Sequence, residues 1–128
     1  MATVTALKTI YAGESDVITI PHTASDGTTA IPFADINDVR YIIKDSQGTT
    51  LLKFKENNPI SWEAATRTAN PGEFQIKILG SQTKTWQAGK VFLEWFINID
   101  DTVLTAHGYS TMGQVYLYDV KASNYSEL

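Results

Sequence analysis

Two histidines are the residues best suited to general-base chemistry in this sequence. A serine, threonine or cysteine nucleophile is usually activated by a neighbouring base, most often histidine. The chain has no cysteine, and His22 and His107 stand far apart in polar segments, without a Gly-x-Ser-x-Gly motif. We interpret both histidines as surface residues and predict no nucleophilic site.

Two acidic groups carry the oxygen ligands that calcium binds: Asp35, Asn37 and Asp38 in one, and Asp100 and Asp101 in the other. Neither group fits a calcium loop that ends in a bidentate glutamate, and zinc would require several closely spaced His or Cys ligands. Asp and Asn are also preferred in tight turns, because their side chains bond to nearby backbone. We interpret both groups as turns and predict no metal site.

Three carboxylates raise the question of glycoside cleavage, in which two acids face one sugar ring. They are Glu73, Glu94 and Asp119, and the sequence sets no distance between them. Glu94 lies within an apolar segment, where a buried carboxylate would pair with a cation such as Lys77 or Lys90. We interpret Glu94 as a structural or interface residue and expect no enzymatic activity.

The glycines at 108 and 113 enclose a short polar stretch that lacks the lysine and the strand–loop–helix context of a phosphate-binding loop. We interpret this stretch as a hairpin turn and predict no cofactor.

The tryptophans leave two hypotheses open. Trp95 belongs to an apolar stripe, whereas Trp62 and Trp86 stand among polar residues and are expected to be partly exposed, for contact with protein or for stacking on a glycan.

The elements that would position these residues are strands. Sixteen threonines and clusters of Val, Ile, Tyr and Phe favour a pleated, half-buried surface, and turn signals recur at intervals of about 10 to 20 residues. Alternation with a period of two predicts strands at 15–21, 38–45, 51–55, 74–78 and 90–99, and a last hairpin of 102–109 and 113–121.

The segment 90–99 is apolar on both faces. Its second face carries Phe92, Glu94 and Phe96, and its first face is the stripe of Val91, Leu93, Trp95, Ile97 and Ile99. Such a strand lies centrally or at a subunit interface.

Together these patterns predict one all-β domain, an antiparallel β-sandwich of seven to nine strands over 13–121. Residues 1–12 form an arm or first strand, which either folds on the sandwich or reaches another subunit, and 122–128 form a tail. A short helical turn is expected only near 61–66 or in the tail.

Charge and hydropathy narrow the partners. The 128 residues carry a net charge of −4, and the ten basic side chains are scattered along the chain. A nucleic-acid binder would show a basic patch or stripe, so we expect no nucleic acid partner. No apolar stretch approaches the roughly 20 residues of a membrane span, and the N-terminus does not resemble a secretion signal. We expect no membrane partner and a location in a cytoplasm or in a particle assembled there.

The order of these strands and turns resembles the N-terminal domain of phage upper baseplate proteins, and small Ig-like domains of phage tail, fibre and head-decoration proteins. The resemblance spans residues 13–120. It departs from the family's pattern at Val91-Phe92, where a tyrosine is more typical. The segments that carry it are GESDVITIP (13–21), VRYIIKD (39–45), PGEFQIKI (71–78) and AGKVFLEW (88–95).

The resemblance implies an Ig-like form of the sandwich and a non-enzymatic virion protein: a head-decoration, head-fibre, baseplate or tail component. Such a protein is assembled in the host cytoplasm and docks on capsid, tail or fibre proteins or on copies of itself. The alternative is a carbohydrate-binding module that holds a glycan of the host surface. The residues expected to make contacts are Trp62, Trp86, Phe92, Glu94, Phe96, Tyr116 and Tyr118.

Overall fold

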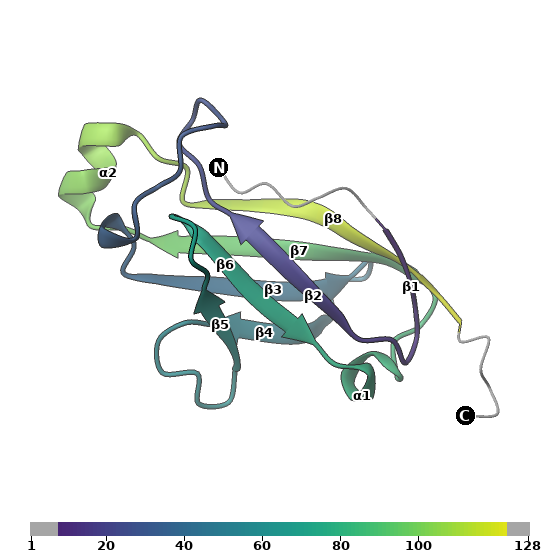
Figure 1. The fold of residues 1–128 in the computed structure, drawn as a ribbon. Helices are drawn as coiled ribbons and strands as arrows, with labels where there is room; N and C mark the ends of the chain where they lie inside the picture. The colour runs from purple at the N-terminus through teal and green to yellow at the C-terminus, as the bar shows by residue number, and fades with distance from the viewer. Residues whose placement is uncertain (1–7, 123–128) are drawn as a thin grey trace.

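The computed structural model describes residues 8–122 of the chain. Eight strands form one sheet in the order β1-β8-β7-β3-β4-β5-β6-β2 (Figure 1). Their bounds are β1 (Lys8–Tyr11), β2 (Asp16–Pro21), β3 (Asp38–Asp45), β4 (Thr50–Lys55), β5 (Glu63–Arg67), β6 (Glu73–Ile78), β7 (Gly89–Asn98) and β8 (Met112–Lys121). The all-β prediction is confirmed. The sheet is mixed, because the pairs β1–β8 and β4–β5 are parallel.

The sheet curls over a single core. Figure 1 shows β2, β6 and β5 lying across β3, β7 and β8. The rings of Tyr41 on β3 and Phe74 on β6 meet with centroids 6.5 Å apart, and the Tyr118 hydroxyl on β8 donates to the Asp16 carboxylate on β2. Apolar side chains on the inner face of both parts fill the space between them, as burial of one face of each strand requires.

The strand β7 follows its predicted pattern. Val91, Leu93, Trp95 and Ile97 are buried, and Ile99 just beyond the strand is buried as well. Phe92, Glu94 and Phe96 between them are half-buried, and Asn98 is exposed. β7 lies between β3 and β8, so it is central, as its two apolar faces predicted.

The predicted strand at 102–109 is wrong, because α2 (Asp101–His107) occupies that segment. Asp101 lies in the first turn of α2, where its carboxylate interacts favourably with the positive end of the helix dipole and stabilises the helix. Gly108 ends the helix with φ 63°, a left-handed conformation that glycine adopts without steric cost. These end signals outweigh the β-branched residues between them. The other helices are short: η1 (Phe33–Asp35) and α1 (Gly80–Thr83).

The ends of the chain and the segment before β5 also differ from expectation. Residues 8–11 of the arm form β1, which pairs with β8 of the same chain. Residues 1–7 lie outside the described residues. The helical turn expected near 61–66 is wrong, since β5 occupies 63–67 and buries Ala65. The helical turn considered for the tail lies outside the described residues, apart from residue 122.

Candidate functional site

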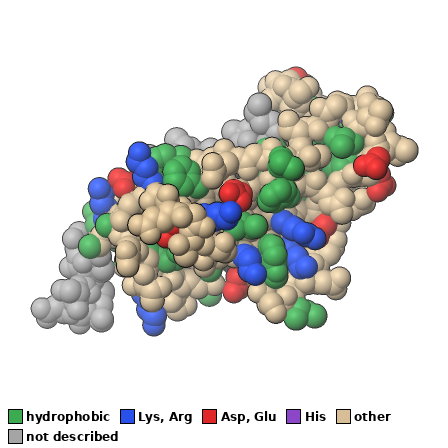
Figure 2. Space-filling model, turned by 180° about the vertical axis from the view of Figure 1, so that it is seen from behind, with side chains coloured by type: hydrophobic (Ala, Val, Ile, Leu, Met, Phe, Trp, Pro, Cys, Tyr) green, Lys and Arg blue, Asp and Glu red, His purple; other side chains and the backbone are tan. Residues whose placement is uncertain are grey.

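The candidate site is the surface of β4, β3, β7 and β8 that points away from the core. Figure 2 shows this side of the molecule, where hydrophobic side chains are bordered by Lys and Arg. Strand register places Ile42 between Lys53 and Glu94, and Phe96 between Arg40 and Met112. We call this surface the outer face; its residues are Lys53, Lys55, Trp62, Arg40, Ile42, Lys44, Phe92, Glu94, Phe96, Met112, Gln114 and Tyr116.

A row of aromatic side chains crosses the outer face. Phe92 on β7 lies opposite Tyr116 on β8, and their ring centroids are 5.2 Å apart. Phe96 lies two residues beyond Glu94, on the same face of β7. The side chains of Phe92, Phe96 and Tyr116 are all half-buried. Phe92 and Phe96 thus share the second face of β7, as predicted, and Tyr116 lies on the same surface.

Tyr118 does not belong to this surface, so its prediction as a contact residue is wrong. A β-bulge between Val91 and Phe92 shifts the register, so that Phe92 faces Tyr116 whereas Val91 faces Tyr118. A bulge adds one residue to one strand and reverses the phase of the side chains beyond it. Tyr118 thus points inward, fully buried.

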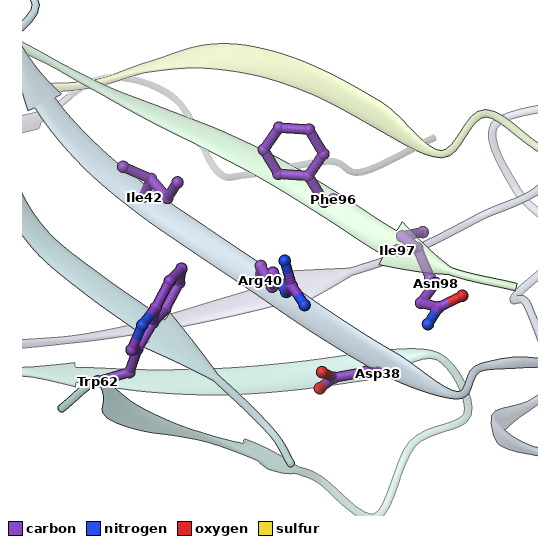
Figure 3. Close-up of a pocket in the computed structure, with 7 residues that line it drawn as sticks. All are labelled: Asp38, Arg40, Ile42, Trp62, Phe96, Ile97 and Asn98. Atoms are coloured by element: carbon purple, nitrogen blue, oxygen red, sulfur yellow. The ribbon is translucent and has the colours of Figure 1, made fainter. Parts of the chain in front are cut away.

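A groove of about 430 Å³ opens on the outer face. Figure 3 shows Trp62 on one side of the groove and Phe96 on the other, with Arg40 between them and Asp38 and Asn98 toward one end. The floor is formed by alternate residues of β3 that point away from the core. Its lining is mostly apolar, with one guanidinium exposed within it.

Trp62 reaches the groove from a tight turn before β5. The Trp62 backbone N–H donates to the Pro59 carbonyl at 2.9 Å, and Ser61 between them has φ 69°. A non-glycine residue in this left-handed region is strained. The Nζ atoms of Lys53 and Lys55 lie 4.8 and 5.5 Å from the Trp62 ring centroid, within cation–π range.

Glu94 is paired, but with a different cation from those expected. Its carboxylate lies 3.2 Å from Nζ of Lys44 on β3, so the predicted pairing with Lys77 or Lys90 is wrong. Lys90 instead lies over the Tyr116 ring, 5.4 Å from its centroid. The ion pair leaves this part of the outer face neutral, and its interpretation as a structural or interface pair remains a prediction.

Trp86 is buried, with 8% of its surface exposed, so the expectation of a partly exposed Trp86 is wrong. The Trp86 backbone N–H donates to the Thr83 carbonyl at 2.9 Å, which turns the chain inward after α1. Its ring then packs 6.3 Å from that of Tyr118. Polar neighbours in the sequence concealed this position, because they face solvent around the turn.

His22 is fully buried, so its interpretation as a surface residue is wrong. Its Nε2 is hydrogen-bonded to the Tyr41 hydroxyl, and its ring packs 5.4 Å from that of Trp95. Burial lowers the pKa of His22 from 6.5 to about 3. The alternation of Ile18 and Ile20 continues to position 22, and this was the signal for an inward side chain.

His107 is exposed at the end of α2, as expected of a surface residue. Its ring stacks on Tyr109 with centroids 5.0 Å apart. Because one histidine is enclosed and the other lies on a helix end, they do not form a shared site.

The acidic groups considered for calcium accept hydrogen bonds where β3 and α2 begin. Asp38 Oδ1 accepts the backbone N–H groups of Val39 and Asn57, and the Asn37 side-chain amide donates to Asp100 at 2.8 Å. The interpretation of both groups as turns is wrong for Asp38, which begins β3, and for Asp100 and Asp101, which are the N-cap and the first residue of α2. Among residues 8–122, no cluster of three or more His, Cys, Asp or Glu residues is placed to hold a metal ion.

The three carboxylates considered for glycoside cleavage have separate partners. Glu73 accepts from the Thr68 hydroxyl at 2.7 Å, Asp119 pairs with Lys121 at 3.3 Å, and Glu94 pairs with Lys44. Asp119 on β8 faces Lys90 on β7. Lys90 is four residues from Glu94, a separation of about 13 Å along a strand.

No protein-family model matches this chain, and no curated protein matches it. Within the described part of the chain, none of the helices has the length and apolar character needed to cross a membrane.

Proposed function

We propose that this chain is a non-enzymatic structural protein of a bacteriophage virion, in which it acts by protein–protein assembly. The outer face is the docking surface. The sequence resemblance suggests a head-decoration, head-fibre, baseplate or tail component, assembled in the host cytoplasm on capsid, tail or fibre proteins or on further copies of itself.

The observation that carries the proposal is the composition of the outer face. Trp62, Phe92, Phe96 and Tyr116 lie on one surface, together with Met112, of which 65% is exposed. Aromatic residues, Met and Arg are the types enriched in protein interfaces, and a contiguous apolar surface rimmed by polar groups marks an interaction site. The opposite face of the same strands is the core, so this apolar surface lies outside the core of the chain.

We also propose that the curled sheet is a variant of the Ig-like β-sandwich. The strands β2, β6 and β5 lie across β3, β7 and β8 with the core between them (Figure 1). This two-layer arrangement supports the proposal, although the parallel pairs β1–β8 and β4–β5 depart from a purely antiparallel sandwich.

Particles of the phage that encodes this chain provide the test. The wild-type chain is expected in purified particles in many copies by quantitative mass spectrometry. Phe96→Glu places a charge in the docking surface and should greatly reduce incorporation. The matched control is Val17→Glu on β2, where the native side chain is 49% exposed, and it should be incorporated normally.

Absence of the wild-type chain from particles would contradict the proposal, as would equal incorporation of both variants.

The alternative function, a carbohydrate-binding module, is favoured by one observation: Trp62 borders a groove that also holds the polar side chains of Asp38 and Asn98. A glycan array separates the two. Binding of a host glycan that Trp62→Ala abolishes would favour the alternative.

A further inference from the structure

The groove on the outer face carries Arg40 and is bordered at Trp62 by Lys53 and Lys55, in a chain whose net charge is −4. We propose that it binds an acidic, extended peptide segment of the partner protein. Arg40, Lys53 and Lys55 hold the carboxylates, and an apolar side chain of the segment packs on Ile42 and Phe96. This inference rests on the proposed docking role of the outer face and names the chemistry of the partner.

The charges around the groove support an anionic partner. The chain has ten basic side chains, and four of them, Lys8, Lys44, Arg67 and Lys121, form ion pairs. Arg40, Lys53 and Lys55 form no ion pair within residues 8–122. The register places them close together, because Arg40 lies opposite Lys55, and Lys53 is two residues from Lys55 on the same face of β4.

The carboxylate that lines the groove offsets one of the three positive charges of Arg40, Lys53 and Lys55, and an excess of positive charge remains. Asp38 is half-buried, and its Oδ1 accepts the backbone N–H groups of Val39 and Asn57. Arg40 is exposed within the groove, and the planar fork of an arginine guanidinium matches a carboxylate with two hydrogen bonds. The groove thus offers a binding position for an acidic side chain.

The floor of the groove favours a peptide over a sugar. Ile42 and Phe96 are apolar and half-buried, and they complement an apolar side chain that alternates with acidic ones along an extended segment. A sugar needs several converging polar groups and a free aromatic ring. Here Asp38 Oδ1 already accepts two backbone N–H groups, and the ammonium groups of Lys53 and Lys55 lie over the Trp62 ring.

Selection from a random peptide library tests the inference and requires no identified partner. The wild-type chain is the target. Peptides that bind the Phe96→Glu variant equally well are removed, so that the remainder depend on the outer face. We expect these peptides to be enriched in Asp and Glu that alternate with aromatic or aliphatic residues, and their binding to weaken as salt is raised.

Variants of equal charge change identify the residues. Arg40→Glu and Lys53→Glu should each weaken binding of a selected synthetic peptide tenfold or more, and Arg40→Gln should weaken it less. Lys77→Glu is the matched control, since Lys77 is exposed on β6, away from the outer face, and should bind as the wild type does. Circular dichroism confirms folding of each variant.

The outcomes separate the two proposals. Selected peptides that depend on Phe96 but carry no acidic excess would overturn the partner class and leave the docking role standing. A selected peptide that binds Arg40→Glu as tightly as Lys77→Glu would do the same. A library without any peptide that depends on the outer face would contradict both proposals, and binding of an acidic glycan through Arg40 and Trp62 would replace the peptide.

Discussion

His22 places an ionisable ring inside the core. Tyr41, Phe74 and Trp95 surround it, and the Tyr41 hydroxyl is its hydrogen-bond partner. A charged imidazolium is poorly solvated there, which is why the pKa of His22 falls from 6.5 to about 3. The neutral ring joins the two parts of the curled sheet, because Phe74 belongs to β6 and Tyr41 to β3.

The low pKa predicts that His22 weakens the fold in acid. Above about pH 6.5 the ring is neutral in both states; below it the unfolded state binds a proton that the folded state excludes down to about pH 3. Stability is therefore lost as pH falls through this window, by roughly 1.4 kcal/mol per pH unit for this residue. Urea denaturation should show a shallower pH dependence for His22→Gln between about pH 7 and pH 4.5. Parallel pH dependences would contradict the buried neutral ring.

At the scale of the elements, β8 combines two devices in ten residues. Its bulge turns Tyr116 outward and Tyr118 inward. Its Gly113 faces Trp95 on β7, so closely that a Cβ atom on Gly113 would lie 2.6 Å from the indole ring. Period-two patterns predicted most strands because one face of each is buried, but a bulge leaves no distinct mark in such a pattern.

Gly113→Ala tests the close contact of β8 with Trp95. The added methyl group forces Trp95 out of a packed position, which should lower the free energy of unfolding by about 1–3 kcal/mol. Chemical denaturation measures this loss. Gln114→Ala is the control on the same strand, where the native side chain is exposed, and should change stability by less than about 0.5 kcal/mol. Equal stability of Gly113→Ala and wild type would contradict the contact.

The turn before β5 positions Trp62 through a strained residue. Ser61→Val should lower stability by about 1–2 kcal/mol, because a β-branched residue tolerates a φ of 69° poorly. It should also shift the NMR resonance of the Trp62 indole N–H. Ser61→Gly should leave both nearly unchanged, since glycine adopts this conformation freely. A normal Trp62 resonance in Ser61→Val would show that the turn does not hold the ring.

At the scale of the whole molecule, the sequence predicted which face of a strand a residue lies on, but not which strands lie side by side in the sheet. The outward direction of Phe92, Glu94 and Phe96 follows from alternation within one strand. The addition of Arg40, Lys53 and Lys55 to the same surface depends on β3 and β4 lying beside β7, and strand order is set by contacts between distant segments. The position of Arg40 between Val39 and Tyr41 indicates an outward side chain, but no local pattern predicts the groove in which it lies.

The parallel pairs illustrate the same limit. β1 pairs with β8 across more than a hundred residues, Lys8 opposite Tyr118, and no local pattern encodes such a pairing. The helix α2 was missed for a different reason: its β-branched residues have strand propensity, which the end signals at Asp101 and Gly108 override.

The central claim is that the outer face is covered by protein in the assembled particle. Hydroxyl-radical footprinting with mass spectrometry measures it most directly, by comparing oxidation of the free chain with oxidation of the chain in particles. We predict strong protection of Trp62, Phe96 and Met112 in particles, with Leu79, which is 50% exposed away from this surface, oxidised at a similar rate in both. Equal oxidation of Phe96 and Met112 in the free and assembled chain would contradict the account.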